Sequence, residues 1–455
     1  MTEHKQTRLT LAKQRRSILW RVALLLLLAI LLVGGGVVYS KWDHLRSLVL
    51  GSHYVGGSSG VAALHLPPDF QASVFYSGLE APRFITFGPD GILFVAERST
   101  GSIVALPDTN RSGKATSKIV VVKGLNDPTS LVFYKGVLYV GEQSQISSFT
   151  LSPDLHVTSK HVVVPHLPVD GNHTTRTVLI GPDGNLYVSI GSTCNVCIET
   201  DSHRAAVWMY HLDGSGGRLY ASGLRNAVGM AINPWNQQIW VTNNGRDLMG
   251  DDTPPETIYH LQDGGNYGWP RCQAGDIIDP DYGHAGDCKG VIQPLIKMPA
   301  HSAPLGLVFY NVPQIPQHYH GLFVAFHGSW NRSVPTGYKV VFIPLGAQGQ
   351  IVGPAQDFIT GWLVNNNDAI GRPVGLAVGP DGALYVSDDK AGIIYRVSYR
   401  VRVGFLHGWG SCASPATTID GHERPLRRIV VAGLAPAIFA IPVLLKSLYV
   451  SCERA

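Results

Sequence analysis

Arginine, histidine and asparagine side chains recur at one position of the chain's pattern, immediately before short apolar segments. Arginine binds carboxylates through paired hydrogen bonds, and a neutral imidazole can accept a proton near neutral pH. If these segments converge, the sequence predicts a pocket for a polyanionic, aromatic or carboxylated ligand. A solvated loop face is the alternative for any single member. The residues concerned are Arg83, His173, Arg176, Arg225, Asn226, His301 and Arg372.

A second group of candidate residues is acidic. Asp251, Asp252 and Glu256 follow one another closely in the chain. Carboxylates there could line the mouth of a substrate pocket or supply oxygen ligands to a cation such as calcium. An acidic loop facing solvent explains the same residues, so both interpretations stay open at this point.

The segments that carry these residues belong to a repeat. Its clearest copies, residues 82–98, 175–191 and 373–389, place two alternating apolar stretches around Gly-Pro-Asp-Gly. Proline and glycine in that order suit a tight hairpin turn, and the alternation suits strands. Looser copies occupy residues 128–143, 227–244 and 304–326.

The six copies predict an all-β fold, a six-bladed β-propeller over residues 65–400. Four-stranded units repeating at intervals of about 40–50 residues are typical of propeller blades. Longer spacing after the fourth and fifth copies predicts insertions around 246–300 and 310–336. Residues that enter the innermost strands of a propeller surround its axis at one end. The arginines and histidines are therefore expected to converge there.

The N-terminal residues predict a membrane anchor. A basic tail at 1–21 is expected to stay in the cytoplasm, and residues 22–40 can span a bilayer as a transmembrane helix. We favour an uncleaved signal anchor over a cleaved signal peptide. After a linker at 41–64, the propeller would lie outside the cytoplasm, at the cell surface or in the periplasm. No structure is predicted for the C-terminal tail at 401–455.

Cysteine usage and charge fit an exported protein. Two close pairs, Cys194 with Cys197 and Cys272 with Cys288, are expected to form disulfides outside the cytoplasm. A zinc site would need a second pair of ligands with the close spacing of Cys194 and Cys197, and the sequence has none. Ile198 stands where covalent haem attachment uses histidine. Part of the net charge of +4 lies in the basic tail, so composition does not indicate nucleic acid as a partner.

Several longer motifs follow one another along the predicted propeller. They are GSTCNVC at 191–197, GLRN at 223–226, HSAPLGLVFY at 301–310, HGSWNR at 327–332 and GRPVG at 371–375. This set resembles the pyrroloquinoline quinone (PQQ)-dependent sugar dehydrogenases of the soluble glucose dehydrogenase type, and more closely their L-sorbosone dehydrogenase-like branch. The resemblance implies oxidation of a sugar or sugar-derived aldehyde or alcohol, with PQQ and Ca²⁺ as cofactors. It also implies an external electron acceptor, a quinone or a cytochrome.

The resemblance assigns roles to individual residues. His173, eight residues before Gly181, matches the general base that takes the proton of the sugar C1 hydroxyl as hydride moves to the PQQ C5 carbonyl. Arg225 matches a catalytic arginine beside the quinone, where a cation would stabilise developing negative charge. The remaining matches to cofactor contacts are Asn226, His301, His327, Arg332 and Arg372.

Metal contacts are implied in the same way. Gly245 and Arg246 match a dipeptide whose backbone carbonyls bind the calcium that polarises the quinone. Substrate contacts are predicted at Arg83, Asp251 and Asp252.

Three positions depart from the family pattern. Ser192 stands where the glucose dehydrogenases have an aspartate that orients the base. Val374 replaces a second PQQ-binding arginine, and no tryptophan that could stack on the cofactor lies near Pro299.

Two other functions are compatible with a propeller. A non-catalytic module that binds glycans or proteins would keep the shape without the cofactor, and Ser192 and Val374 favour it. A calcium-dependent hydrolase of the gluconolactonase or strictosidine synthase kind would require acidic side chains on the axis, where this chain has basic ones. The motifs GLRN, HGSWNR and GRPVG favour the dehydrogenase.

Overall fold

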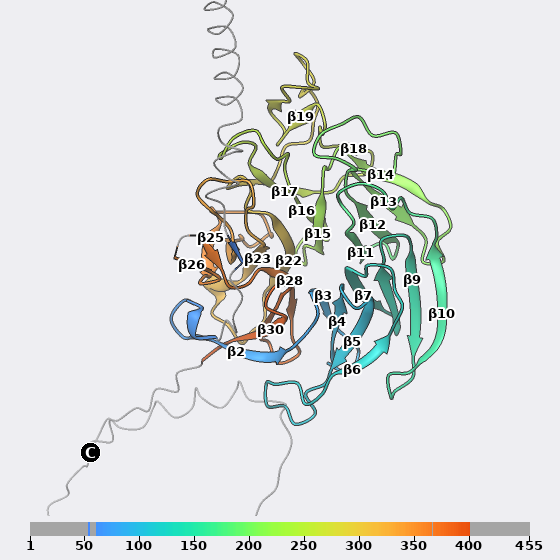
Figure 1. Cartoon of the computed structure of the whole chain (residues 1–455), viewed down its shortest axis with the longest axis vertical. Helices are drawn as coiled ribbons and strands as arrows, with labels where there is room; N and C mark the ends of the chain where they lie inside the picture. Colours follow the sequence, from blue (N-terminus) through green and yellow to red (C-terminus); the bar gives the residue numbers. More distant parts are fainter. Residues whose placement is uncertain (1–52, 55–60, 366, 401–455) are drawn as a thin grey trace, which may run out of the picture. The chain divides into compact units, whose positions relative to one another are not determined.

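Each of the six predicted repeats forms the first hairpin of one antiparallel sheet, and the six sheets surround a common axis (Figure 1). The computed structural model describes residues 53–54, 61–365 and 367–400. Alternating apolar residues of the repeats form the core between the sheets. The predicted all-β, six-bladed propeller is confirmed.

The first three blades follow one another along the chain. Blade 1 contains β3 (Pro82–Phe87), β4 (Leu93–Glu97), β5 (Ser102–Leu106) and β6 (Ile119–Val122). Blade 2 contains β7 (Ser130–Tyr134), β8 (Val137–Gly141), β9 (Ile146–Leu151) and β10 (Val157–Val164). Blade 3 contains β11 (Arg176–Ile180), β12 (Leu186–Ile190), β13 (Ala206–Tyr210) and β14 (Arg218–Ser222), beside which β18 (Gly265–Asn266) runs parallel.

The last three blades complete the ring. Blade 4 contains β15 (Ala227–Ile232), β16 (Ile239–Asn243), β17 (Glu256–His260) and β21 (Ile296–Met298). Blade 5 contains β22 (Pro304–Tyr310), β23 (Gly321–Phe326), β24 (Lys339–Pro344) and β25 (Gln356–Ile359). Blade 6 contains β28 (Pro373–Val378), β29 (Leu384–Asp388), β30 (Ile393–Tyr399) and the early strand β2 (Phe70–Ser77). Because β2 pairs with β30, the two ends of the described chain close the ring.

Shorter elements lie in the connections. The insertion between β17 and β21 carries β18 and a small hairpin of β19 (Cys272–Gln273) and β20 (Ile277–Ile278). The predicted disulfide between Cys272 and Cys288 is present in it. The other short elements are η1 (Val61–Ala63), η2 (Gln317–Tyr319) and a sheet of β1 (His53–Tyr54), β26 (Leu363–Val364) and β27 (Asp368–Ala369).

The first strand of each blade contacts the first strands of both neighbouring blades, so these strands line the axis. Their backbones approach closely. A Cβ atom at Gly229 would lie 2.1 Å from the carbonyl oxygen of Leu305, which leaves room only for glycine. The hydroxyl of Thr242 donates a hydrogen bond of 2.8 Å to the same carbonyl. The axis is thus rigidly packed and fixes where the blade-entry loops begin.

Strand register places two sets of loops at one end of the axis. In blade 3, Arg176 at the start of β11 pairs with Ile190 at the end of β12, so the loops before β11 and after β12 lie together. The same pairing holds in the other blades. We call this end the entry face. The Gly-Pro-Asp-Gly turns lie at the opposite end.

No helix in residues 53–54, 61–365 or 367–400 is long and apolar enough to cross a membrane. The predicted basic tail at 1–21, the anchor at 22–40 and the tail at 401–455 lie outside the described residues, as does most of the linker at 41–64.

Candidate active site

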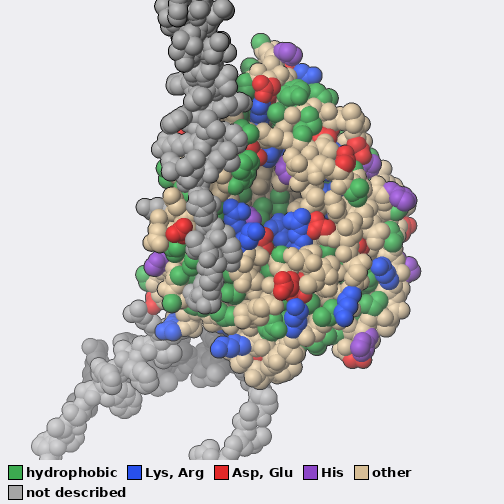
Figure 2. Space-filling view, in the orientation of Figure 1, with side chains coloured by type: hydrophobic (Ala, Val, Ile, Leu, Met, Phe, Trp, Pro, Cys, Tyr) green, Lys and Arg blue, Asp and Glu red, His purple; other side chains and the backbone are tan. Residues whose placement is uncertain are grey.

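The entry face is hollowed, and lysine and arginine side chains gather in the hollow (Figure 2). A cavity of about 310 Å³ lies here. His173 and Arg225, the two predicted catalytic residues, both line it although they come from different blades. The other lining residues are Asn172, Asn195, Asp247, Leu248 and Trp330.

His173 is held as a neutral imidazole with one nitrogen free. Its Nδ1 lies 2.8 Å from the carbonyl oxygen of Ser192 and 3.0 Å from the Ser192 hydroxyl. That hydroxyl donates its own proton to the carbonyl of Cys194 at 2.7 Å, so Nδ1 must carry the donating hydrogen. The lone pair of His173 is therefore on Nε2, the atom that a general base uses.

Electrostatics keep this imidazole unprotonated. Burial, followed by the positive charge of Arg225, lowers the pKa of His173 to about 3. Arg204 and Arg176 act in the same direction, whereas the hydrogen bond to Ser192 opposes them. Neither arginine is exposed to solvent. Three cations near one imidazole disfavour its protonated form. His173 can therefore accept a proton, but the imidazolium that results is short-lived.

Arg225 is 4% exposed and fully engaged by the protein. Its Nε donates to the Asn195 carbonyl at 2.9 Å, and its Nη2 donates to Asn195 Oδ1 at 2.9 Å and to Asp247 at 2.8 Å. Its Nη1 donates to the Gly245 carbonyl at 2.6 Å. The guanidinium is thus fixed at the cavity wall with a single carboxylate partner.

Asn226 lies against His173 across Gly191. A Cβ atom at Gly191 would come within 2.6 Å of both Asn226 Oδ1 and His173 Cβ, so glycine is needed for the two side chains to meet. The backbone N–H of Asn226 donates to Asn243 Oδ1 at 3.1 Å. The predicted Arg225–Asn226 pair therefore lies beside the predicted base.

The calcium site at the backbone carbonyls of Gly245 and Arg246 stays a prediction. The Gly245 carbonyl accepts the hydrogen bond from Arg225, a cation that would repel calcium. The buried Arg246 side chain donates to Asp279 at 2.6 Å and also pairs with Asp281, so it anchors the insertion between β17 and β21. In the described part of the chain, the one cluster with metal-ligand spacing contains the disulfide-bonded Cys194 and Cys197.

Glu256, the third acidic candidate, is buried beneath this wall. It accepts hydrogen bonds from the backbone N–H groups of Gly245 at 2.6 Å and Ala303 at 3.2 Å. Burial raises the pKa of Glu256 to about 7. The carboxyl group therefore holds the start of the loop and does not line the cavity mouth.

His301, Arg332, Asp251 and Asp252 connect the loops of blades 4 and 5. His301 Nε2 lies 2.8 Å from the Gly250 carbonyl. Arg332 pairs with Asp252 at 2.7 Å, and its Nη1 donates to the Asp251 carbonyl. Arg332 thus joins Asp251 and Asp252, and the Asp251 carboxylate also accepts from the backbone N–H of Ser333 at 3.0 Å. They hold the loop that carries Leu248 against the loop that carries Trp330.

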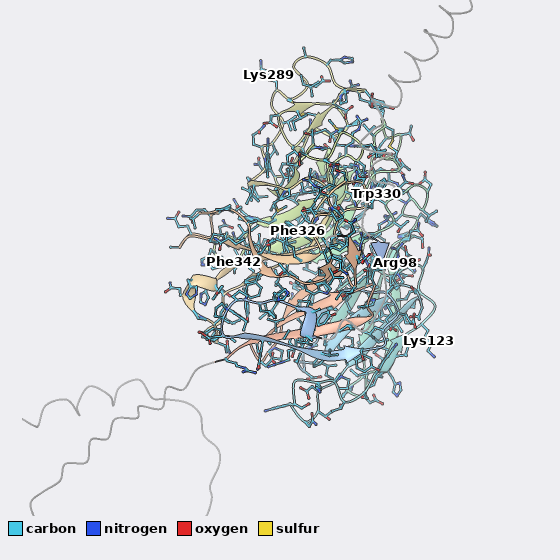
Figure 3. The ribbon with its side chains drawn as sticks, turned by 60° about the vertical axis from the view of Figure 1, so that its left-hand side comes forward. Arg98, Lys123, Lys289, Phe326, Trp330 and Phe342 are labelled. Atoms are coloured by element: carbon cyan, nitrogen blue, oxygen red, sulfur yellow. A yellow bond between two sulfur atoms is a disulfide. The ribbon has the colours of Figure 1, made fainter. Side chains whose placement is uncertain are left out.

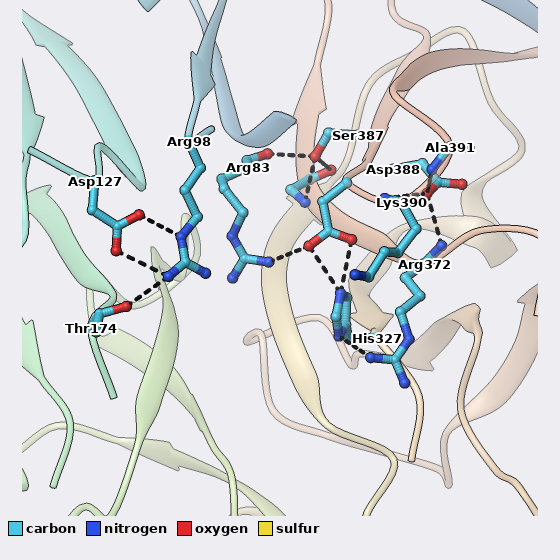
Figure 4. Close-up of polar contacts among 12 residues, drawn as sticks. Arg83, Arg98, Asp127, Thr174, His327, Arg372, Ser387, Asp388, Lys390 and Ala391 are labelled. Carbon is cyan, nitrogen blue, oxygen red and sulfur yellow. Dashed lines mark hydrogen bonds and ion pairs between the residues drawn. The ribbon is translucent and has the colours of Figure 1, made fainter. Parts of the chain in front are cut away.

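Blades 5, 6 and 1 contribute a second polar group (Figure 4). His327 Nε2 lies 3.0 Å from an oxygen of Asp389, whose carboxylate also accepts from Arg83 at 2.8 Å. Although burial opposes ionisation, His327 and Arg83 hold the pKa of Asp389 well below its usual range. Burial lowers the pKa of His327. Three predicted residues, Arg83, His327 and Arg372, thus lie in one network with an aspartate that the sequence did not single out.

Arg372, like Arg176, forms no ion pair among the described residues. Its guanidinium donates to the Tyr338 hydroxyl at 2.8 Å and to the carbonyls of Gly328 and Ser329 at 3.3 Å, and Nη1 lies 3.5 Å from His327. No carboxylate pairs with it within residues 61–365 and 367–400. Its charge is therefore available to a carboxylate of a ligand.

Unused polar groups fit a carboxylated aromatic cofactor such as PQQ. Besides the charge of Arg372, the buried Nε of Arg83 and the buried Nε of Arg332 have no hydrogen-bond partner in the described structure. Trp330 is 52% exposed and lines the cavity, which offers an aromatic face. In Figure 3, Trp330 and Arg98 lie along the same edge of the ribbon.

The departures from the family pattern have structural counterparts. Ser192 does contact the base, but through its carbonyl and hydroxyl. Val374 is completely buried and packs with Val228 and Leu305 on the axis. Trp330, in the HGSWNR motif, brings a tryptophan to the cavity from a different loop than the one near Pro299. Sequence reasoning quoted the motifs containing Trp330 and Asn195 without assigning either residue a role.

A propeller whose blade-entry loops bring a histidine and several arginines to one end of the axis defines a class with a central ligand site. The family model described as TrAA12-like matches residues 64–281 and 281–400, so the chain belongs to the TrAA12-like family.

Individual relatives agree with this membership. A pyrroloquinoline quinone-dependent pyranose dehydrogenase of Coprinopsis cinerea is 29% identical over 394 residues, covering 72% of this chain and 53% of that protein. A pyrroloquinoline quinone-dependent sugar dehydrogenase of Hypocrea jecorina is 26% identical, covering 70% and 85%. The chain thus spans about half the length of the Coprinopsis cinerea protein.

Among solved structures, the holo form of the pyranose dehydrogenase PQQ domain from Coprinopsis cinerea superposes with a TM-score of 0.66 at 26% identity. The match covers 74% of this chain and 97% of that domain. These relatives support the predicted resemblance to PQQ-dependent sugar dehydrogenases. The L-sorbosone branch stays a prediction.

Proposed function

We propose that this chain is an exported, membrane-anchored PQQ-dependent dehydrogenase of a sugar or sugar-derived aldehyde or alcohol similar to L-sorbosone or glucose. The observation that carries the proposal is the pairing of His173, neutral with Nε2 free, with Arg225 in one cavity. The names of the relatives supply the reaction class.

The chain's own residues account for the proton. A sugar hydroxyl in the cavity would lose its proton to His173 Nε2, while Nδ1 stays bonded to Ser192. Because three arginines disfavour the imidazolium, the proton would leave readily for solvent, which resets the base. Arg225, fixed by Asn195 and Asp247, would stabilise negative charge that develops beside it.

PQQ, when bound, would supply the acceptor for the two electrons and the hydrogen that leave the sugar carbon. Arg372 and Arg83 would hold its carboxylates, Asn226 would contact its polar edge, and Trp330 would pack on a ring. Electrons would then pass to a separate quinone or cytochrome, because the described chain has no covalent haem site. Calcium belongs to the proposal through the resemblance alone, and no step above depends on it.

A cofactor titration tests the proposal. Purified full-length protein is titrated with PQQ, with and without Ca²⁺, and absorbance, Tm and dye reduction are followed over a panel of aldoses that includes glucose and L-sorbosone. We expect saturable PQQ binding and sugar-dependent dye reduction. If PQQ at tens of micromolar changes neither the spectrum nor the Tm, the proposal fails.

A propeller that binds glycans or proteins without catalysis is the second candidate. It is favoured by Val374, which fills the axis where the family has an arginine. Glycan binding that is independent of PQQ, together with no dye reduction, would support it.

A further inference from the structure

The loop closed by the Cys194–Cys197 disulfide bonds to Arg225 directly and to His173 through Ser192. It follows β12 of blade 3 at the entry face. His173 precedes β11 of the same blade, whereas Arg225 precedes β15 of blade 4. One short loop therefore bridges the two blades that carry the base and the cation.

Asn195, inside this loop, makes four hydrogen bonds. Its carbonyl and Oδ1 each accept from Arg225 at 2.9 Å. Oδ1 also accepts from the backbone N–H of Asp247 at 2.8 Å, and Nδ2 donates to the Asp247 carbonyl at 3.0 Å. Asn195 thus fixes the guanidinium and also fixes the residue that supplies its counter-charge.

Cys194 reaches the base through Ser192. The Cys194 carbonyl accepts the Ser192 hydroxyl proton, which makes the hydroxyl oxygen an acceptor for His173 Nδ1. If Cys194 moved, that hydroxyl could rotate and stop accepting from Nδ1, and the Ser192 carbonyl would remain the acceptor that keeps the hydrogen on Nδ1. The second hydrogen bond that orients the base therefore depends on where the disulfide holds Cys194.

We propose that the disulfide-closed loop Cys194–Cys197 is the positioning element of the active site, with Asn195 as the positioning residue for Arg225, and that opening this disulfide lowers activity. The proposal rests on the proposed function, since it assigns roles around His173 and Arg225.

Besides the disulfide, a hydrogen bond holds the base of the loop. Glu199 accepts a hydrogen bond of 2.7 Å from the backbone N–H of Thr193, so the fold should survive when the disulfide opens.

The first test is Asn195→Ala, with Asn185→Ala as the matched control. Asn185 lies in blade 3 at the opposite end and bonds to Asp183 and His211. We expect kcat of Asn195→Ala to fall about 10- to 100-fold, the usual cost of losing an orienting partner, with KM changed less. Asn185→Ala should match the wild type in kcat.

A pH profile separates positioning from a structural role. The groups facing His173 are Arg225, Arg204 and Arg176. If Asn195→Ala lets Arg225 move away, the acid limb of kcat should shift to higher pH. A variant that folds and keeps both the wild-type kcat and the wild-type acid limb would overturn the proposal.

The second test opens the disulfide without substitution. Dithiothreitol transfers two electrons and two protons to the S–S bond, which breaks into two thiols while the reagent becomes its cyclic disulfide. Cys194 and Cys197 are partly exposed, whereas Cys272 is fully buried, so mild reduction followed by alkylation should label the first pair and spare the second. Peptide mass spectrometry confirms which pair reacted.

We expect the enzyme alkylated at Cys194 and Cys197 to lose about 10-fold or more of kcat while its Tm in the absence of PQQ stays close to that of the untreated protein. Reoxidation instead of alkylation should restore activity. Unchanged kcat in the alkylated protein would refute the redox dependence. If untreated protein neither binds PQQ nor reduces dye, the proposed function has failed. In that case, NMR signals of the Arg225 Nε group would still report whether this side chain becomes mobile in Asn195→Ala. They would thereby test whether the loop positions it.

Discussion

Two of the predicted histidines at the entry face, His173 and His327, have partners that give them different chemistry. His173, on blade 3, bonds to a neutral carbonyl and a hydroxyl and keeps Nε2 free. His327, on blade 5, lies 3.0 Å from the carboxylate of Asp389 through Nε2 and 3.5 Å from Arg372 through Nδ1. Both ring nitrogens of His327 are therefore occupied, and only His173 can receive a proton from a substrate without breaking an ionic network.

The difference divides the site by task. The side formed by blades 3 and 4 holds a base and a cation through mostly neutral acceptors, which suits proton transfer. The side formed by blades 5, 6 and 1 is an ionic network of Arg83, Asp389 and His327, next to Arg372 with its unpaired charge. That side suits ligand binding. Substitutions on the two sides should therefore affect different measured constants.

The largest effect is expected for His173→Gln. Glutamine can keep a hydrogen bond to Ser192 but cannot accept a proton, so kcat should fall about 10²- to 10⁴-fold while PQQ affinity changes little. Steady-state dye reduction and a PQQ titration measure the two constants. The control is His211→Gln, an exposed histidine of the same blade at the opposite end. Retention of more than a tenth of kcat would remove His173 from the role of base.

Arg372→Gln should give the opposite pattern. A charged hydrogen bond contributes about 1.5–3 kcal/mol, so PQQ should bind roughly 10- to 150-fold more weakly while kcat at saturating PQQ stays near the wild-type value. Arg396→Gln, which breaks the exposed pair with Asp381 on the same blade, is the control. A fall in kcat without a change in PQQ affinity would contradict the division of the site.

The fold could be predicted from the sequence because its information is local and repeated. Each copy of the repeat carries its own alternation and turn, so β3 with β4, or β28 with β29, could be located without knowledge of the rest. The convergence of His173 and Arg225 followed from the same logic. Both stand directly before a first strand, and the ring brings such positions together.

The partners of these residues could not be predicted in the same way. Asp389 contacts His327, which is 62 residues away in the sequence, and Asn195 contacts Arg225, which is 30 residues away. No periodicity links such positions, because loops of different length set them. The calcium prediction illustrates the limit. Side-chain identity does not reveal what a backbone carbonyl binds. Only the structure shows that Arg225 donates a hydrogen bond to the Gly245 carbonyl.

Ser192→Asp would give the base of blade 3 the kind of partner that His327 has. A carboxylate near Nδ1 favours imidazolium and should raise the pKa of His173 by about 1–3 units. The wild-type pKa of about 3 lies below the ordinary value of 6.5, so the wild-type base stays active as pH falls until pH approaches 3. The acid limb of kcat in Ser192→Asp should appear at correspondingly higher pH.

Ser192→Ala is the control for that experiment, since it removes the hydroxyl but leaves the carbonyl that accepts from Nδ1. Its acid limb should move much less.

The depressed pKa of His173 also predicts how stability changes with pH. The unfolded histidine binds a proton near pH 6.5 and the folded one only near 3, so this residue's contribution to stability falls as pH drops through that window. An acid limb near pH 6.5 in the wild-type enzyme would contradict both expectations.

The smallest effect is expected from calcium on the protein without PQQ. In this state the Gly245 carbonyl bonds to Arg225 at 2.6 Å, and Arg246 is committed to Asp279 and Asp281. A ligand that binds only the folded state raises Tm in proportion to ln(1 + [L]/Kd). Millimolar Ca²⁺ or a chelator should therefore leave the Tm unchanged in calorimetry. A clear rise with Ca²⁺ would mean that Arg225 gives up the carbonyl, and the base side of the site would then be built around a metal instead of a guanidinium.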